Sequence, residues 1–353
     1  MTLYFYILKQ YLKDFLLLLL ALTFVVTIID FVQHFSSIEG INREFLYFIY
    51  SAANSMMMIY PLALVFAAIV TLSRLITRNH LIVLGSFGYP KKVLVKPLLS
   101  AIFGVYLIII ALNFTQFAYS SDTARAIIDK RQLFKSVENL FFKYNDSFVY
   151  VEELDVANKI LKNITMYTID DKKIEDILRI ERATFKGGAW LAQGIRKEHI
   201  IFDNGKPLRY DTESLGDRLI LEGYFPKVIS LLYEGKRMSI QDGFKALKLL
   251  NEQKVDSSKV IAALYEKLVM PLFAPIIVLL ILIYTPISKR YMNPIKYYLF
   301  GISITMLTWV ILYGINILTI NSVLPATYSQ PLVILLILFI TIYLWFKESK
   351  RLA

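Results

Sequence analysis

The chain has 353 residues, of which 56% are hydrophobic, more than the roughly half that is usual in soluble domains. It contains no cysteine, which excludes disulfides and thiolate metal sites, and its three histidines are too widely scattered to suggest a metal centre. The formal net charge is +11, but residues 119–258 are almost neutral, so the excess lies beside apolar segments and does not indicate nucleic-acid binding.

Six apolar segments are long enough to cross a bilayer, which takes about 20 residues in a helix. The first lacks an Ala-x-Ala-like cleavage site and exceeds the apolar length of a signal peptide, so we count it as a span. The sequence thus predicts three spans within residues 1–118, a soluble domain at 119–258, and three spans within 259–353. The six expected spans are residues 15–35, 45–72, 98–118, 260–284, 297–319 and 330–346.

Basic residues gather on one side of these spans. The opposite short loops carry Arg43 as their basic residue. Because cytoplasmic loops are enriched in Lys and Arg, we expect both termini and the 73–97 loop in the cytoplasm and residues 119–258 in the periplasm of a Gram-negative cell. The basic flanks comprise Lys9 and Lys13; Arg74, Arg78, Lys91, Lys92 and Lys96; Lys289, Arg290 and Lys296; and Lys347, Lys350 and Arg351.

The 73–97 loop has an unusual pattern, with five basic residues, no acidic residue and an apolar run from His80 to Phe87. Gly88 can adopt the positive φ that ends a helix, and Pro90 prevents its continuation. A short amphipathic helix of this kind fits an apolar groove on a cytoplasmic partner. The alternative is a helix that lies on the lipid surface.

Residues 119–258 show β patterning. The stretch "SFVYVEEL" alternates, with Phe148 and Tyr150 on one face and Val149 and Val151 on the other. Gly187-Gly188 predicts a hairpin, and residues 203–205 predict a second turn. We expect a sandwich or jelly roll. From Ser239, with Asp242 three residues on, a capping pattern and apolar residues at helical spacing predict a helix that returns the chain to the membrane.

The chain carries no phosphate-binding loop, no metalloprotease motif and no nucleophile elbow. We therefore expect no catalytic residue and no cofactor, and any work must draw on a partner or a gradient. Ionisable residues inside spans often mark function. The candidates are Asp30 and His34 at the outer end of the first span and Glu266 near that of the fourth.

Several stretches, in their order and spacing, resemble the LptF/LptG (YjgP/YjgQ) family of lipopolysaccharide-export permeases along the whole chain. "TIIDFVQHF" and the segment around "MSI" are more similar to the LptG branch than to LptF. The resemblance is carried by "SFVYVEEL", "ITMYTID", "ATFKGGAWLAQGI", "MSIQDGFKALKLLNEQ" and "LYEKLVMPLFAPIIVLLIL".

The resemblance implies a fold and a set of partners. The fold is a membrane α-helical bundle of six transmembrane helices with an inserted periplasmic β-jelly-roll domain, in the bacterial inner membrane. The partners are a second, LptF-like permease and an LptB-like ATPase dimer. The complex extracts lipopolysaccharide from the inner membrane and passes it to LptC-like and LptA-like periplasmic jelly rolls.

The resemblance also assigns residues, and two of them depart from the family pattern. His80 stands where many relatives have Glu, and Asp30 lies where relatives often have a basic residue. The residues expected to couple to the ATPase are Arg78, His80, Leu81, Leu84, Gly85, Phe87 and Gly88; those expected to contact lipid are Asp30, His34, Arg125, Lys130 and Arg131.

Other interpretations remain open. The chain could be the LptF paralogue, or a mechanotransmission permease of the FtsX/MacB type, although that class usually has four spans. A membrane-anchored receptor would leave the 73–97 loop unexplained. Asp30 and His34 could be ordinary interface residues at the headgroup level, and Arg125 could simply balance the charges of Asp122 and Asp129.

Overall fold

The computed structural model describes residues 2–351 apart from 129–136, 146, 157, 171–172, 204–205, 227–228, 230–237 and 254–255. The chain divides into two compact units. The first, the helical unit, combines Met1–Ile128 with Ile261–Ala353, and the second, the β unit, comprises Asp129–Val260.

Six helical segments of the described chain are long and apolar enough to span a membrane, as predicted. The first begins at Thr2, well before the expected start at residue 15. The segments are α1 (Thr2–His34), α2 (Ile41–Thr77), α4 (Val95–Asn113), α8 (Ser258–Leu268) with α9 (Phe273–Tyr284), α10 (Pro294–Ile320) and α11 (Ser329–Arg351).

Two spans differ in detail from the prediction. The fourth is broken, because a 3-10 turn at Met270–Leu272 separates α8 from α9. Pro271 in this turn has no N–H to donate, and its ring would clash within a continuous helix. The third span ends at Asn113 rather than at 118. Beyond it, Thr115 caps a second 3-10 turn at Gln116–Tyr119 by accepting a hydrogen bond from the backbone N–H of Phe117 at 3.2 Å.

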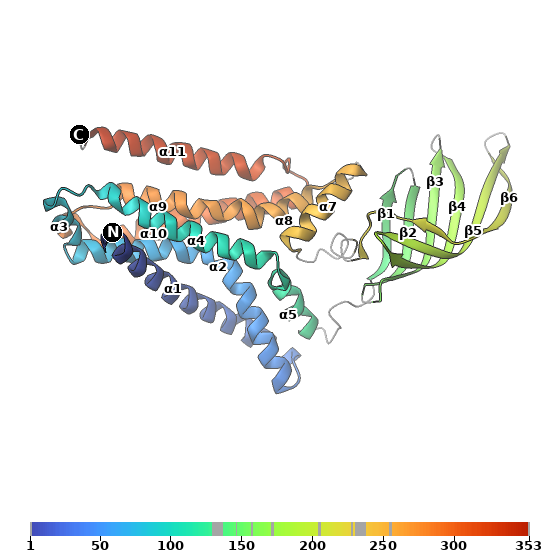
Figure 1. Cartoon of the computed structure of the whole chain (residues 1–353), viewed down its shortest axis with the longest axis horizontal. Coiled ribbons are helices and arrows are strands. Elements are labelled where there is room, and N and C mark those ends of the chain that lie inside the picture. The colour runs from blue at the N-terminus through green and yellow to red at the C-terminus, as the bar shows by residue number, and fades with distance from the viewer. Residues whose placement is uncertain are drawn as a thin grey trace. The chain divides into compact units, whose positions relative to one another are not determined.

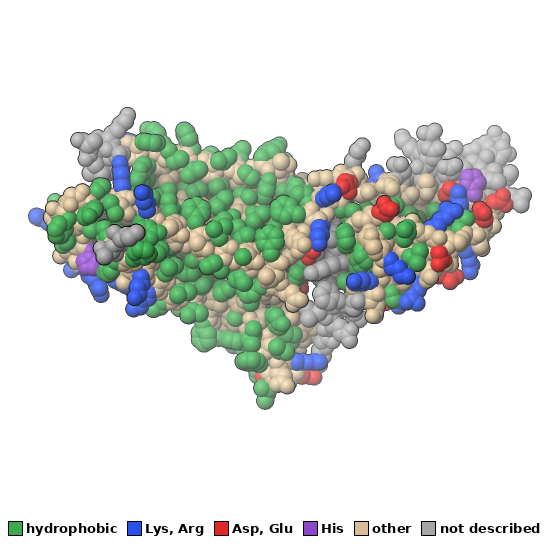
Figure 2. All heavy atoms as spheres, viewed as in Figure 1, with side chains coloured by type: hydrophobic (Ala, Val, Ile, Leu, Met, Phe, Trp, Pro, Cys, Tyr) green, Lys and Arg blue, Asp and Glu red, His purple; other side chains and the backbone are tan. Residues whose placement is uncertain are grey.

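The helices differ in how much of their surface the protein itself covers. The most apolar windows of α2 and of α8–α9 are 72% and 67% buried, whereas those of α1 and α11 are each 17% buried. Figure 2 shows the resulting broad apolar surface over the helical unit. Such a surface suits lipid or a second membrane protein rather than water.

The helical unit has two distinct ends. The short helix α3 (His80–Ser86), the start of α1 and the end of α11 lie at one end, here called the α3 end (Figure 1). At the opposite end, here called the α5 end, α5 (Ser120–Ile128) packs against α2, and a 3-10 turn at Phe35–Ser37 follows α1.

The described residues of the β unit form one antiparallel sheet of seven strands, in which each of the first six lies beside its neighbour in sequence and β7 pairs with β5. No Greek-key crossover of a jelly roll is present among the described strands, so that expectation is not confirmed. The strands are β1 (Val137–Tyr144), β2 (Ser147–Asp155), β3 (Ile160–Asp170), β4 (Lys173–Lys186), β5 (Ala189–Asp203), β6 (Lys206–Leu215) and β7 (Arg218–Ile220).

Several local predictions in the β unit are confirmed. The Gly187-Gly188 turn joins β4 to β5 through the pair Lys186↔Ala189. Strands β5 and β6 close at Asp203↔Lys206, although Asn204 and Gly205 lie outside the described residues. Helix α7 (Ile240–Glu252) begins at Ser239, whose Oγ accepts a hydrogen bond from the Asp242 backbone N–H at 3.1 Å.

A line of backbone irregularities crosses five strands of the sheet, and we call it the seam. Pairing is interrupted at the same position in the β1–β2, β2–β3, β3–β4 and β4–β5 ladders. On β1, β3 and β5 the residue in the seam has a positive φ, of 58°, 49° and 69° respectively. The seam residues are Asn139, Glu152, Asn163, Glu181 and Gly194.

The seam shifts the inward-facing pattern by one residue on every strand that it crosses. Buried residues next to it are three apart instead of two, as with Val151 and Leu154. The pairing register is the same on both sides of the seam, so the seam is a break in the ladders and not a bulge of one strand against the next. The corresponding buried pairs are Val137 and Leu140, Leu161 and Ile164, Ile180 and Ala183, and Ala192 and Ile195.

Candidate functional site

The 73–97 segment forms a helix with defined ends, as predicted. Asn79, with φ of 58°, turns the chain between α2 and α3. At the other end Gly88 adopts a φ of 76°. The Gly88 and Tyr89 backbone N–H groups donate to the Gly85 and Leu84 carbonyls, each at 2.9 Å, which satisfies carbonyls that a helix end leaves free.

Helix α3 has an inner and an outer face. Leu81, 5% exposed, packs into the core of the helical unit, and Leu84 lies partly buried against the same core. Leu81 therefore faces its own chain in this structure, not the partner groove in which we expected it. The outer face carries Ile82, Val83 and Phe87, and Phe87 is 75% exposed.

The remaining residues expected to couple to an ATPase are spread around this helix. Arg78 lies exposed at the end of α2. His80 is half-buried, with its ring centroid 6.0 Å from that of Tyr6 in α1. Gly85 has open space where a Cβ would stand. The arrangement places an apolar outer face between basic flanks.

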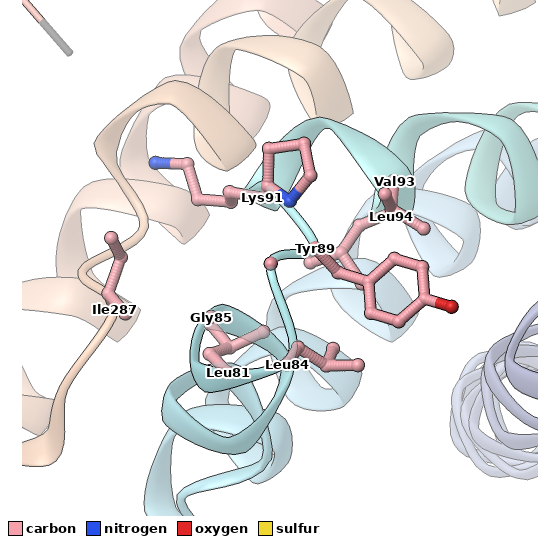
Figure 3. A pocket seen from close by; sticks show the side chains of 10 residues that line it. Leu81, Leu84, Gly85, Tyr89, Lys91, Val93, Leu94 and Ile287 are labelled. Carbon is pink, nitrogen blue, oxygen red and sulfur yellow. The ribbon is translucent and has the colours of Figure 1, made fainter. Parts of the chain in front are cut away.

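A pocket of about 270 Å³ lies beside α3 (Figure 3). Lys91 extends past it to the end of α9, where its Nζ donates to the carbonyls of Ile283 and Thr285 at 3.0 and 2.9 Å. The last carbonyls of a helix lack intrahelical partners and form the negative end of its dipole. The sequence marked Lys91 only as a topology signal. The pocket is lined by Leu81, Leu84, Gly85, Gly88, Tyr89, Pro90, Lys91, Val93, Leu94 and Ile287.

A buried ion pair near the α3 end was also missed. Asp14 of α1 is 4% exposed, and Arg74 of α2 donates to both of its carboxylate oxygens, at 2.8 and 3.1 Å. Thr71 donates to the same carboxylate at 2.8 Å, and Gln10 does so at 3.3 and 3.2 Å. An isolated buried carboxylate would be unstable, so these donors are what permit Asp14 there.

At the α5 end, Asp30, His34, Tyr47 and Ser51 form what we call the outer polar cluster. The Asp30 carboxylate accepts hydrogen bonds from Tyr47 at 2.7 Å and Ser51 at 2.5 Å. His34 Nδ1 lies 3.0 Å from the Tyr47 hydroxyl and 3.5 Å from an Asp30 carboxylate oxygen. The cluster joins α1 to α2: Asp30 and His34 lie together on α1, and Tyr47 and Ser51 of α2 complete the set.

Arg125 lies close to this region on α5. The neighbouring Ala124 packs in a small apolar cluster with Ile38 and Tyr47. The Arg125 side chain is exposed, and among the described residues it makes no ion pair, including with Asp122. It is therefore available to an external anion. Lys130 and Arg131, the other expected lipid contacts, lie outside the described residues, as does Asp129.

A comparison with protein families matches residues 5–347 to the lipopolysaccharide export system permease LptF/LptG. In a comparison with curated proteins, none matches significantly. The family match extends over all six apolar segments, α3 and the β unit. The chain therefore belongs to the LptF/LptG family of lipopolysaccharide export permeases.

Proposed function

We propose that the chain is the LptG-type transmembrane subunit of an ATP-driven lipopolysaccharide exporter. In this proposal it pairs with an LptF-like permease, and an LptB-like ATPase dimer supplies the energy. The observation that carries the coupling part of the proposal is the apolar outer face of α3, exposed within a basic loop. The family match supports the transport part.

We place the α3 end in the cytoplasm. The basic residues Arg78, Lys92 and Lys96 are exposed at this end, and Figure 2 shows Lys and Arg gathered there. Cytoplasmic loops are enriched in such residues. Two spans, α1 and α2, lie between the N-terminus and α3, and four spans lie between α3 and the C-terminus, so both termini are on the same side as α3. A single span, α4, separates α3 from residues 129–260, which therefore lie in the periplasm.

The outer face of α3 would insert into an apolar groove on the ATPase. Ile82, Val83 and Phe87 supply the apolar contact, and Leu81 and Leu84 hold the helix to the permease. His80 stands where relatives often have Glu. Its contact with Tyr6 supports an inward, positioning role in this chain rather than an ion pair with the ATPase.

The substrate path would begin at the α5 end. A lipid A phosphate would meet the exposed Arg125 guanidinium, which can hold it with two parallel hydrogen bonds. The outer polar cluster would line the same region, where the donors on Asp30 reduce the repulsion that its charge would otherwise exert on a phosphate. The acyl chains would pass into a jelly-roll-type trough in the β unit, and from there to LptC-like and LptA-like partners.

The coupling claim is tested by replacing Phe87 with Asp. A carboxylate in an apolar groove costs several kcal/mol if it stays ionised, so the ATPase should be lost from the purified complex at normal permease yield. Phe87→Leu, which keeps the apolar contact, serves as the matched control and should retain it. Full ATPase retention by Phe87→Asp would favour the alternative that α3 lies on the lipid surface.

A further inference from the structure

The 73–97 segment is anchored to the bundle at both of its ends. At its start, the Tyr298 hydroxyl of α10 donates to Ser73 Oγ at 2.8 Å. At its exit, Lys91 donates to the Ile283 and Thr285 carbonyls at the end of α9. Both anchors lie on the α9–α10 pair, far along the chain from the segment: the Lys91 bonds join residues 192 and 194 positions apart, and the Ser73 bond joins residues 225 apart.

The carbonyl of Thr285 that Lys91 binds belongs to a residue that is itself hydrogen-bonded to both α9 and α10. Thr285 is 2% exposed, and its Oγ1 donates to the Ile281 carbonyl at 2.8 Å and lies 3.2 Å from the Tyr297 hydroxyl. Tyr297 belongs to the first turns of α10. The Lys91 ammonium group therefore holds the point at which α9 ends and is tied to α10.

The outer face of α3 has no comparable attachment, since Ile82, Val83 and Phe87 are exposed. A force applied to α3 can reach the bundle through the apolar contacts of Leu81, Leu84 and Leu94 with the core, or through the hydrogen bonds of Lys91. The pocket between α3 and Ile287 leaves the apolar route loosely packed on this side (Figure 3). Lys91 spans that gap with directional hydrogen bonds, which resist displacement where loose apolar contacts do not.

We propose that Lys91 is a positioning residue for transport: it makes the coupling segment and the α9–α10 junction move as one body. Movement of the ATPase then reaches α9 and α10 and is not lost in the loop. This inference rests on the proposed docking of an ATPase on α3. It assigns Lys91 to transmission, not to docking, because its ammonium group faces α9 and not the outer face of α3.

The test uses the complete complex, with its ATPase and second permease, in proteoliposomes. The measured quantity is lipopolysaccharide released per ATP hydrolysed. For Lys91→Ala we expect a fall of about tenfold, with the ATPase still bound and ATP hydrolysis near the wild-type rate. Lys91→Arg keeps a charged donor that can reach the carbonyls, so it should retain at least half of the wild-type release per ATP. If Lys91→Ala assembles poorly, the Lys91→Arg variant still tests the inference.

Lys96→Ala is the matched control. Lys96 is exposed in the same basic flank and makes no hydrogen bond or ion pair with a described residue, so its loss removes the same charge without the anchor. Its release per ATP should equal that of the wild type. A fall in Lys96→Ala as large as in Lys91→Ala would reduce the effect to flank charge and overturn the inference.

Other outcomes separate this inference from the proposed function. A normal release ratio in Lys91→Ala would overturn the role of Lys91 and leave ATPase docking intact. Loss of the ATPase from both Lys91 variants would mean that Lys91 supports ATPase docking. That result would also overturn the inference that Lys91 transmits movement to α9 and α10. If the wild-type complex itself held no ATPase, the proposed function would fail, and the inference with it.

Discussion

At the scale of single residues, charged side chains in the helical unit fall into two groups, those bonded inside the bundle and those exposed on its surface. Asp14, Lys91 and Lys267 are hydrogen-bonded inside the bundle; Lys267, for example, donates to Asn113 Oδ1 at 2.6 Å. Arg125 projects outward from α5 without an ion pair among the described residues. The first group stabilises helix contacts, and Arg125 is the one of these four that is exposed and without an ion pair among the described residues.

Substitutions of Arg125 should separate charge from geometry. A charge-assisted hydrogen bond to a phosphate contributes about 1.5–3 kcal/mol. Arg125→Lys keeps the charge but loses the planar fork, so we expect partial lipopolysaccharide release. Arg125→Glu should lose most release while basal ATP hydrolysis and permease yield stay normal. Wild-type release by Arg125→Glu at normal yield would remove Arg125 from the substrate site.

The Asp14–Arg74 pair predicts a stability effect. Asp14→Leu leaves Arg74 without its carboxylate, and because the Arg74 side chain is 34% exposed and can reach water, we expect a loss of about 1–3 kcal/mol, less than for a fully buried pair. Replacing both residues with Leu should recover much of the loss, since apolar pairs often substitute well for buried ion pairs. Thermal unfolding in detergent measures both variants. An unchanged melting temperature for Asp14→Leu would show that the pair does not stabilise the α1–α2 contact.

At the scale of elements, the features that could be predicted from the sequence are those set by local patterns of residues, namely the spans and the ends of individual helices. Apolar length located six spans, Gly88 and Pro90 located the end of α3, and Ser239 located the start of α7. The contacts of Lys91 and Asp14 could not be predicted, because each joins segments far apart in the chain and their sequence signal is the same as that of an ordinary basic or acidic flank.

The seam corresponds to a sequence pattern, apolar residues three apart within a strand, from which no prediction was made. Five strands contain buried apolar residues three apart, such as Ile180 and Ala183. A spacing of three breaks the alternation of a strand, and its recurrence on five strands indicates an aligned break in the sheet rather than poor strands. The expected jelly roll needed long-range connections that alternation cannot reveal.

Gly194 provides a test of the seam. Its φ is +69°, and a Cβ there would lie 3.0 Å from a carboxylate oxygen of Glu181. Gly194→Ala should destabilise the β unit by about 1–2 kcal/mol, the usual cost of a left-handed conformation. Gly216→Ala is the control, because Gly216 has no positive φ and open space around it.

Trp190, fully buried in the sheet, can report this unfolding once Trp309 and Trp345 are replaced by Phe. A lower melting temperature for Gly194→Ala than for Gly216→Ala is the expected result. Equal melting temperatures would show that the positive φ at Gly194 is not required for the fold of the sheet.

At the scale of the whole molecule, the proposal requires a single orientation in the membrane. The start of α1, the end of α11 and α3 share one end of the helical unit (Figure 1). A reporter fused at Lys91 or after Ala353 should therefore report cytoplasm, and one fused at Lys206 should report the periplasm. A cytoplasmic signal at Lys206 would contradict the proposal, because the β unit could then not receive a lipid from the outer leaflet.

The central claim is that ATP hydrolysis on the α3 side drives lipopolysaccharide out of the membrane through this permease. Its most direct test is release of lipopolysaccharide from proteoliposomes that contain the complete complex, measured by transfer to an added acceptor jelly roll. The account predicts release that requires ATP and that Phe87→Asp abolishes together with ATPase binding. Sustained ATP hydrolysis by the wild-type complex with no lipopolysaccharide reaching the acceptor would contradict it.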